Sequence, residues 1–205
     1  MNAPKAIIEE ACTIFLIAAG DRRLEARELT QVHAREVVRG SVWIADQPQF
    51  AGVPPSALAG VVVVAGDVLA VRDALTEFDV QETPAIARAY RSEGPSSSSC
   101  EGASLIAAMR PAAGLSRKEA MRAWQAHVPL ALDVHLGARR YVQYEMLSDA
   151  MPFFGMVDLH FESRAAVDSG LFRTPEDAHR VNQDAARFSG GTDMFIGSQY
   201  AMPAA

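Results

Sequence analysis

The chain has 205 residues, of which 49% are hydrophobic and 21% charged, an ordinary globular composition with ample material for a core. Its formal net charge of −6 argues against binding to nucleic acid or to an anionic membrane, because such proteins usually carry a basic patch. The two cysteines, Cys12 and Cys100, belong to no CxxC or CxxH motif, which argues against a disulfide framework or a zinc site.

Neither the N-terminal residues nor the apolar runs indicate export or a membrane anchor. Glu9 and Glu10 stand where a signal peptide would have its hydrophobic region. The apolar runs at residues 13–19 and 58–65 are far too short to span a bilayer. We therefore expect a soluble cytoplasmic protein.

A stretch rich in glycine, proline and serine divides the chain almost evenly. We predict an N-terminal repeat at residues 1–93, a linker at residues 94–102 and a C-terminal repeat at residues 103–205. Each repeat has the pattern strand, helix, strand, strand, helix, strand. In the N-terminal half the predicted elements include strands at residues 13–19, 41–45 and 60–65 and a helix at residues 24–38.

The first helix of the C-terminal half carries the most informative segment. It follows a predicted strand at residues 104–110, and Ser116 and Glu119 form a capping box at its start. Trp124 and His127 share one face of this helix, and Pro129 is predicted to kink or end it. A similar but weaker pattern occurs in the N-terminal half, where His33 follows Gln31 by two residues, just as His127 follows Gln125.

The remaining C-terminal elements are two strands, helical material and a closing strand. We predict strands at residues 139–147 and 154–162, helical material to about residue 188 with Ser163 or Thr174 as its cap, and a strand at residues 194–202. The strand at residues 154–162 alternates. Its two faces carry Val157, Leu159 and Phe161 on one side and Met156, Asp158 and His160 on the other.

This order predicts an α+β fold of two ferredoxin-like βαββαβ repeats. Both helices of such a repeat cover one face of its sheet and leave the other bare. Two copies cover each other by closing a pseudo-twofold α+β barrel. Asp158 and His160 would then point into the barrel, and Val157, Leu159 and Phe161 would lie under the helices.

The C-terminal half resembles the EthD-type members of the dimeric α+β barrel superfamily. The resemblance covers about half the chain and rests on these segments: GLSRKE (residues 114–119), WQAHVPL (124–130), RRYV (139–142), FGMVDLHFES (154–163) and DAARF (184–188). The N-terminal half resembles the family only through the internal repeat. The chain departs from the family at Phe154, where an acidic residue usually precedes the glycine of the third strand.

The resemblance implies a scaffold and a pocket more than a reaction. Its EthD-type relatives include dehydratases and decarboxylases of polyketide anthrones. The wider superfamily holds isomerases, cofactor-free monooxygenases, cyclases and haem enzymes.

His127 is the leading candidate for catalysis, because imidazole can take and return a proton near neutral pH. A packing histidine stacked near Trp124 is the alternative. His160 and Asp158 are expected to polarise or orient a substrate, the alternative being an ordinary solvent-facing strand.

The expected substrate-binding residues surround these three. Tyr141 and Tyr144 face opposite ways on their strand, so one offers a phenol to the pocket and the other is structural. Trp124, Met156 and Tyr144 would wall the cavity. Asp184 could reach His127 or simply pair with Arg187.

The other histidines receive weaker assignments. We interpret His33 as a relic or as part of an altered second pocket, and His135 and His179 as solvated side chains. The sequence contains no HxxxH or HExxH motif, no phosphate-binding loop and no GxSxG elbow. We therefore expect no metal and no cofactor.

The sequence thus favours a cofactor-independent lyase or isomerase, of the dehydratase, decarboxylase or cyclase type, acting on a small apolar or aromatic, polyketide-like molecule. A haem-binding barrel enzyme and a non-catalytic small-molecule-binding protein of a catabolic pathway are the alternatives. The expected partner is a small-molecule substrate rather than nucleic acid or membrane. The chain would be a monomer with an internal pseudo-dimer, or a homodimer.

Overall fold

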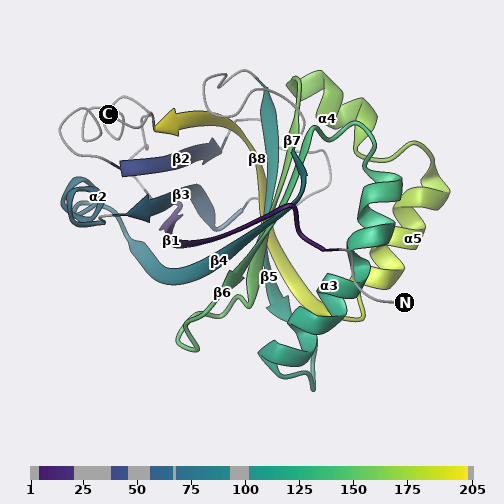
Figure 1. Cartoon of the computed structure of the whole chain (residues 1–205), viewed down its shortest axis with the longest axis horizontal. Coiled ribbons are helices and arrows are strands. Elements are labelled where there is room, and N and C mark those ends of the chain that lie inside the picture. Colours follow the sequence, from purple (N-terminus) through teal and green to yellow (C-terminus); the bar gives the residue numbers. More distant parts are fainter. Residues whose placement is uncertain (1–4, 21–37, 46–55, 67, 93–101, 203–205) are drawn as a thin grey trace.

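The strands form one closed barrel with helices on its outside (Figure 1). The computed structural model describes residues 5–20, 38–45, 56–66, 68–92 and 102–202. In these residues the N-terminal half contributes β1 (Ile8–Ala18), β2 (Val38–Ala45), β3 (Leu58–Gly66), α2 (Leu69–Ala74) and β4 (Val80–Ser92). The C-terminal half contributes β5 (Ala103–Pro111), α3 (Arg117–Val134), β6 (Arg140–Met146), β7 (Gly155–Phe161), α4 (Arg164–Gly170), α5 (Pro175–Ala185) and β8 (Ser189–Met202).

The ring order of the strands shows the duplication directly. Around the barrel the N-terminal half runs β4-β1-β3-β2 and the C-terminal half runs β8-β5-β7-β6. In each half the last strand lies beside the first, the first beside the third and the third beside the second, which is the order of a ferredoxin-like sheet. The two sheets join through β2 with β8 and β4 with β6. The predicted α+β barrel of two ferredoxin-like repeats is confirmed.

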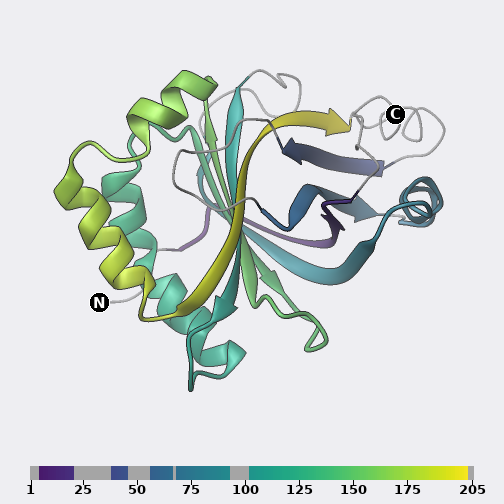
Figure 2. The same ribbon diagram turned by 180° about the vertical axis from the view of Figure 1, so that it is seen from behind.

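Strand β8 makes one of these joins and also completes its own sheet. It pairs with β5 along one part of its length and with β2 along another. Figure 2 shows it, in yellow, curving from the end of α5 towards β2. The linker predicted at residues 94–102, the helix at residues 24–38 and His33 lie almost wholly outside the described residues, so the exact limits of the repeats stay a prediction.

Alternation along the strands separates two cores. On β7, Met156 packs inside the barrel, whereas Val157, Leu159 and Phe161 pack beneath the helices of the C-terminal half. The predicted facing of this strand is therefore confirmed. The four valines of β3 divide in the same way: two face the barrel interior, and two face the cluster that includes Val71 of α2.

Helix α3 begins as predicted but runs further than expected. The Ser116 hydroxyl accepts a hydrogen bond from the backbone N–H of Glu119, whose carboxylate accepts one from the backbone N–H of Ser116. The expectation that Pro129 could end the helix is wrong, because the helix continues to Val134. Burial of the turn after the proline offsets the lost backbone hydrogen bond, since Ala131 and Val134 pack into the core.

A residue of the N-terminal half completes the end of α3. The guanidinium of Arg91 in β4 donates hydrogen bonds to the carbonyls of Leu132, His135 and Ala138. These carbonyls lack partners within the helix, and a cation there also interacts favourably with the helix dipole. The two repeats are therefore joined by side chains as well as by strand pairing.

The predicted helical material after β7 consists of α4 and α5. Each has its own cap: the Ser163 hydroxyl accepts from the backbone N–H of Ala166, and the Thr174 hydroxyl from that of Asp177. Of the helices in the described part of the chain, none is both long and apolar enough to cross a membrane.

Candidate functional site

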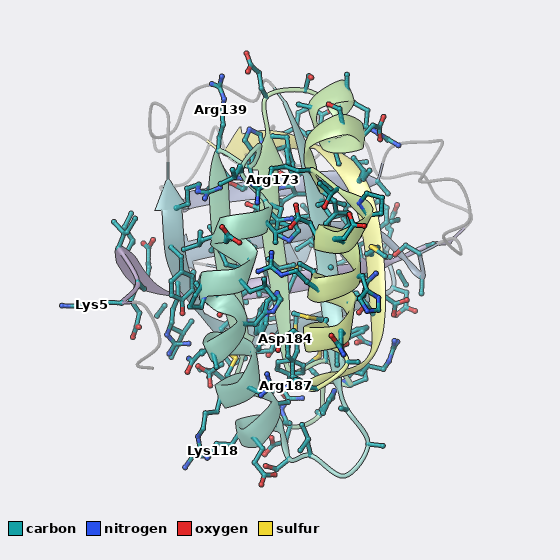
Figure 3. All side chains as sticks on the ribbon, turned by 90° about the vertical axis from the view of Figure 1, so that its right-hand side faces the viewer. Lys5, Lys118, Arg139, Arg173, Asp184 and Arg187 are labelled. Carbon is teal, nitrogen blue, oxygen red and sulfur yellow. The ribbon has the colours of Figure 1, made fainter. Side chains whose placement is uncertain are left out.

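A cavity of about 750 Å³ lies between the outer face of the C-terminal sheet and the helices that cover it. We call it the helix-side cavity. Its walls come from α3, α4 and α5, and Figure 3 shows α3 and α5 side by side in front of the sheet. Apolar and aromatic side chains such as Trp124, Phe172 and Phe188 make up most of its lining. Such a volume and lining are typical of a small-molecule site.

His127 and Asp184 form a hydrogen-bonded pair at this cavity. Nδ1 of His127 in α3 lies 2.8 Å from Oδ2 of Asp184 in α5. The other carboxylate oxygen of Asp184 accepts a hydrogen bond of 2.6 Å from Arg187. Asp184 lies at the end of α5 and Arg187 just beyond it, and both are labelled in Figure 3. Both pairings considered for Asp184 from the sequence are therefore present together.

The protonation of this pair follows from its surroundings. Burial lowers the pKa of His127, and this effect exceeds the raising effect of the Asp184 carboxylate. Burial raises the pKa of Asp184, but the hydrogen bonds from His127 and Arg187 outweigh it and hold that pKa below its usual range. Near neutral pH the imidazole is neutral and the carboxylate ionised, so Nδ1–H donates to Asp184. Nε2 then carries a lone pair and has no hydrogen-bond partner among the described residues.

His135 also lines the cavity, and the sequence-based interpretation of it as solvated is wrong. Its exposed fraction is 5%, because the segment after α4 covers it. Nδ1 lies 2.7 Å from the carbonyl oxygen of Leu171, which can only accept, so Nδ1 carries the proton. The position of His135, eight residues after His127, indicated the same face of α3. His179, in contrast, is exposed as expected.

On the sheet side of the cavity, Tyr141 and Gln143 form a second polar pair, of which only Tyr141 was predicted from the sequence. Tyr141 of β6 lines the cavity, and its hydroxyl oxygen lies 2.9 Å from Nε2 of Gln143. Gln143 is fully buried and had no predicted role. The alternation of β6 was the available signal, because residues 141 and 143 must share a face. Trp124 packs edge-on against Phe154 at 5.6 Å between ring centroids.

The other predicted site residues lie inside the barrel, on the opposite face of the sheet. Asp158 is fully buried and accepts a 2.8 Å hydrogen bond from Nε of Arg140, which also donates to Gln199. Nδ1 of His160 lies 3.1 Å from the hydroxyl of Ser104. These residues therefore belong to a polar network in the barrel interior.

Tyr144 and Met156 lie in the apolar part of the barrel interior. The ring of Tyr144 packs against Trp43, with 6.4 Å between ring centroids. Burial raises the pKa of Tyr144, so its phenol stays protonated. Neither side chain lines the helix-side cavity.

The structure thus separates the predicted site into two groups. His127, Trp124, Tyr141 and Asp184 gather at or beside the helix-side cavity, whereas Asp158, His160, Tyr144 and Met156 lie inside the barrel. One substrate cannot contact both groups, because successive side chains of a strand point to opposite faces of the sheet. The cavity lies on the apolar face of β7, not on its polar face.

The comparisons with known proteins show the fold. Neither a protein-family model nor a curated protein matches this chain. Among solved structures it is similar to an anthrone oxidase-like protein, with 10% identity, 97% of this chain and 96% of that chain covered, and a TM-score of 0.62. A presumed monooxygenase from Lactobacillus acidophilus NCFM has 8% identity, covers 96% of this chain and 98% of its own, and has a TM-score of 0.55.

A mutant chlorite dismutase from Candidatus Nitrospira defluvii in complex with cyanide is also similar. It has 10% identity, covers 94% of this chain and 91% of its own, and has a TM-score of 0.52. The chain therefore has the dimeric α+β barrel fold that these proteins share. A shared fold does not identify the reaction, which depends on the residues of the cavity.

A haem in this cavity would require an axial ligand and partners for its two carboxylates. His127, with Nδ1 held by a carboxylate, has the arrangement of an axial iron ligand. However, no lysine or arginine of the described residues lines the cavity, so the two carboxylates of a haem would lack cationic partners there. Nor do three His, Cys, Asp or Glu side chains of the described part of the chain gather into a metal site. The described lining does not fit haem.

Proposed function

We propose that this chain is a cofactor-independent lyase or isomerase that removes a proton from a small apolar or aromatic substrate in the helix-side cavity. The observation that carries the proposal is the His127–Asp184 pair: a neutral imidazole whose Nδ1 is held by a carboxylate and whose Nε2 is left as a base. The resemblance of residues 104–200 to EthD-type proteins supports the same class.

In the proposed reaction His127 acts first as a base and then as an acid. Nε2 takes a proton from the substrate, and the resulting imidazolium is stabilised by Asp184 at 2.8 Å. Return of that proton to another carbon completes an isomerisation. Its delivery to a departing hydroxyl completes a dehydration.

The walls of the cavity support this chemistry. Trp124, Phe172 and Phe188 offer flat apolar surfaces, which favour an aromatic or polycyclic substrate. Burial of His127 strengthens its interaction with Asp184. The name of the anthrone oxidase-like neighbour is consistent with a substrate of this shape.

The proposal is tested by hydrogen exchange in D2O, which needs no knowledge of the natural substrate. The wild-type protein should accelerate deuterium incorporation next to the carbonyl of 2-tetralone, a small enolisable bicyclic ketone, as followed by NMR. His127→Gln should lose the acceleration, and His179→Gln, which alters an exposed histidine of α5, should keep it. Exchange at the wild-type rate in His127→Gln would overturn the proposal.

The two alternatives predict different results. A haem enzyme would give a Soret band on addition of haemin, and the His127→Gln variant would lose that band. A non-catalytic carrier would bind 2-tetralone equally well in the wild-type protein and in His127→Gln, with no exchange in either.

A further inference from the structure

The hydrogen bonds of Gln143 show that the hydroxyl oxygen of Tyr141 acts as an acceptor towards it. Nε2 of Gln143 lies 3.4 Å from the carbonyl oxygen of Trp124 and 2.9 Å from the hydroxyl oxygen of Tyr141. A carbonyl oxygen can only accept, so the Gln143 atom facing it must be the amide nitrogen. The same nitrogen therefore donates to Tyr141, and the hydroxyl oxygen of Tyr141 is an acceptor in this contact.

The proton of Tyr141 is thus left for the cavity. Gln143 already donates to this oxygen, so the hydroxyl can still donate its own proton elsewhere. Burial raises the pKa of Tyr141 well above its usual range, which keeps the hydroxyl protonated. Within the described residues the Tyr141 hydroxyl donates no hydrogen bond, and Tyr141 lines the cavity. A buried donor of this kind needs a partner, and a ligand can provide it.

We infer that Tyr141, oriented by Gln143, donates a hydrogen bond to the oxyanion that forms when His127 removes a proton, and that the substrate is an uncharged enolisable ketone or a phenol. The inference rests on the proposed function and adds its substrate class. For a ketone, the C–H electron pair forms the C=C bond as the proton moves to His127. The carbonyl electron pair moves to oxygen, which Tyr141 stabilises until the proton returns.

The charges of the cavity favour this class over carboxylate-bearing compounds. No lysine or arginine of the described residues lines it, so a carboxylate would lose its hydration without gaining a cationic partner. An oxyanion that exists only during the reaction does not require a cationic partner. A hydrogen bond from the neutral hydroxyl of Tyr141 is enough to stabilise it. Gln143 is a positioning residue, because it acts only through Tyr141.

Binding of 2-naphthol, whose phenolate has its own absorption band, tests the inference without any turnover. The wild-type protein should bind both forms of the probe. Tyr141→Phe should weaken binding of the phenolate on the order of ten- to a hundred-fold and leave binding of the neutral form unchanged. Tyr200→Phe removes a phenol that packs beside the core of the N-terminal half and lines no part of the cavity, so it should bind like wild type.

Gln143→Met provides a second measurement, which decides the question if Tyr141→Phe does not fold. It leaves the hydroxyl in place without its orienting donor, so phenolate binding should weaken by roughly two- to ten-fold. Equal phenolate affinity in wild type and both variants would overturn the inference. So would equal loss of both probe forms, which indicates mere packing, or no binding by wild type.

The test separates the inference from the proposed function. If Tyr141→Phe keeps full phenolate affinity while His127→Gln abolishes exchange into 2-tetralone, the role of His127 as base is supported and the role of Tyr141 as oxyanion donor is rejected. If Tyr141→Phe loses phenolate affinity while His127→Gln still catalyses exchange, the binding role of Tyr141 is supported and the role of His127 as base is rejected.

Discussion

The carboxylate of Asp184 holds Nδ1 of His127 at 2.8 Å, across 57 residues of sequence and between two helices. Because Nδ1 is occupied, the imidazole presents only Nε2 to the helix-side cavity. This contact converts a buried histidine into a base of defined orientation, and it leads to the first prediction.

Replacing Asp184 by Asn should reduce catalysis without unfolding the protein. An amide can offer either hydrogen or oxygen to Nδ1, so the correct tautomer of His127 is no longer enforced. We expect kcat to fall on the order of ten- to a hundred-fold, as for other residues that orient a functional histidine. The acid limb of the pH–rate profile should move to lower pH, because Asp184 raises the pKa of His127. Asp133→Asn, an exposed change on α3, is the control.

Folding stability should decrease on acidification below about pH 6.5, the ordinary pKa of histidine. Burial lowers the pKa values of both His127 and His135, so the unfolded chain binds protons that the folded chain does not. Stability is therefore complete above the unfolded pKa and is lost as the pH falls towards the folded values. Urea unfolding between pH 8 and pH 5 measures this. The free energy of unfolding should depend less steeply on pH in His135→Gln. An unchanged dependence would contradict a lowered pKa for His135.

Replacing Asp158 by Asn should affect the fold and leave the reaction intact. The change leaves the Arg140 guanidinium in the barrel interior without its counter-charge. We expect a loss of about 1.5–3 kcal/mol in the free energy of unfolding, the range for a hydrogen bond to a charged group. Exchange into 2-tetralone per folded molecule should stay at the wild-type rate. A large loss of exchange at unchanged stability would contradict this and indicate that Asp158 takes part in the reaction.

Replacing Gly155 by Ala should disturb the indole of Trp124. A Cβ at this position would lie 2.5 Å from Cζ3 of Trp124 and 2.9 Å from the backbone oxygen of Tyr144. The overpacking should cost about 1–3 kcal/mol and change the fluorescence of Trp124. Gly170→Ala is the control, because its Cβ would meet its nearest neighbour at an ordinary 3.6 Å. Wild-type stability and fluorescence in Gly155→Ala would show that the indole moves freely.

Features that depend on neighbouring residues were predictable from the sequence. The alternation of residues 156–161 indicated which side chains face the barrel, and Ser116 with Glu119 marked the start of α3. The repeated order of strands and helices predicted a barrel closed by two ferredoxin-like halves. These predictions hold because strand and helix periods are set by local backbone geometry.

Contacts between distant residues were decided only by the tertiary structure. Arg91 of the other repeat donates hydrogen bonds to carbonyls at the end of α3, which continues past Pro129 to Val134. The packing of α3, α4 and α5 leaves the cavity on the apolar face of β7, whereas the sequence suggested the polar face. The sequence by itself determined which side chains share a face. The packing decided which face holds the cavity, because an enclosed space depends on all the elements that surround it.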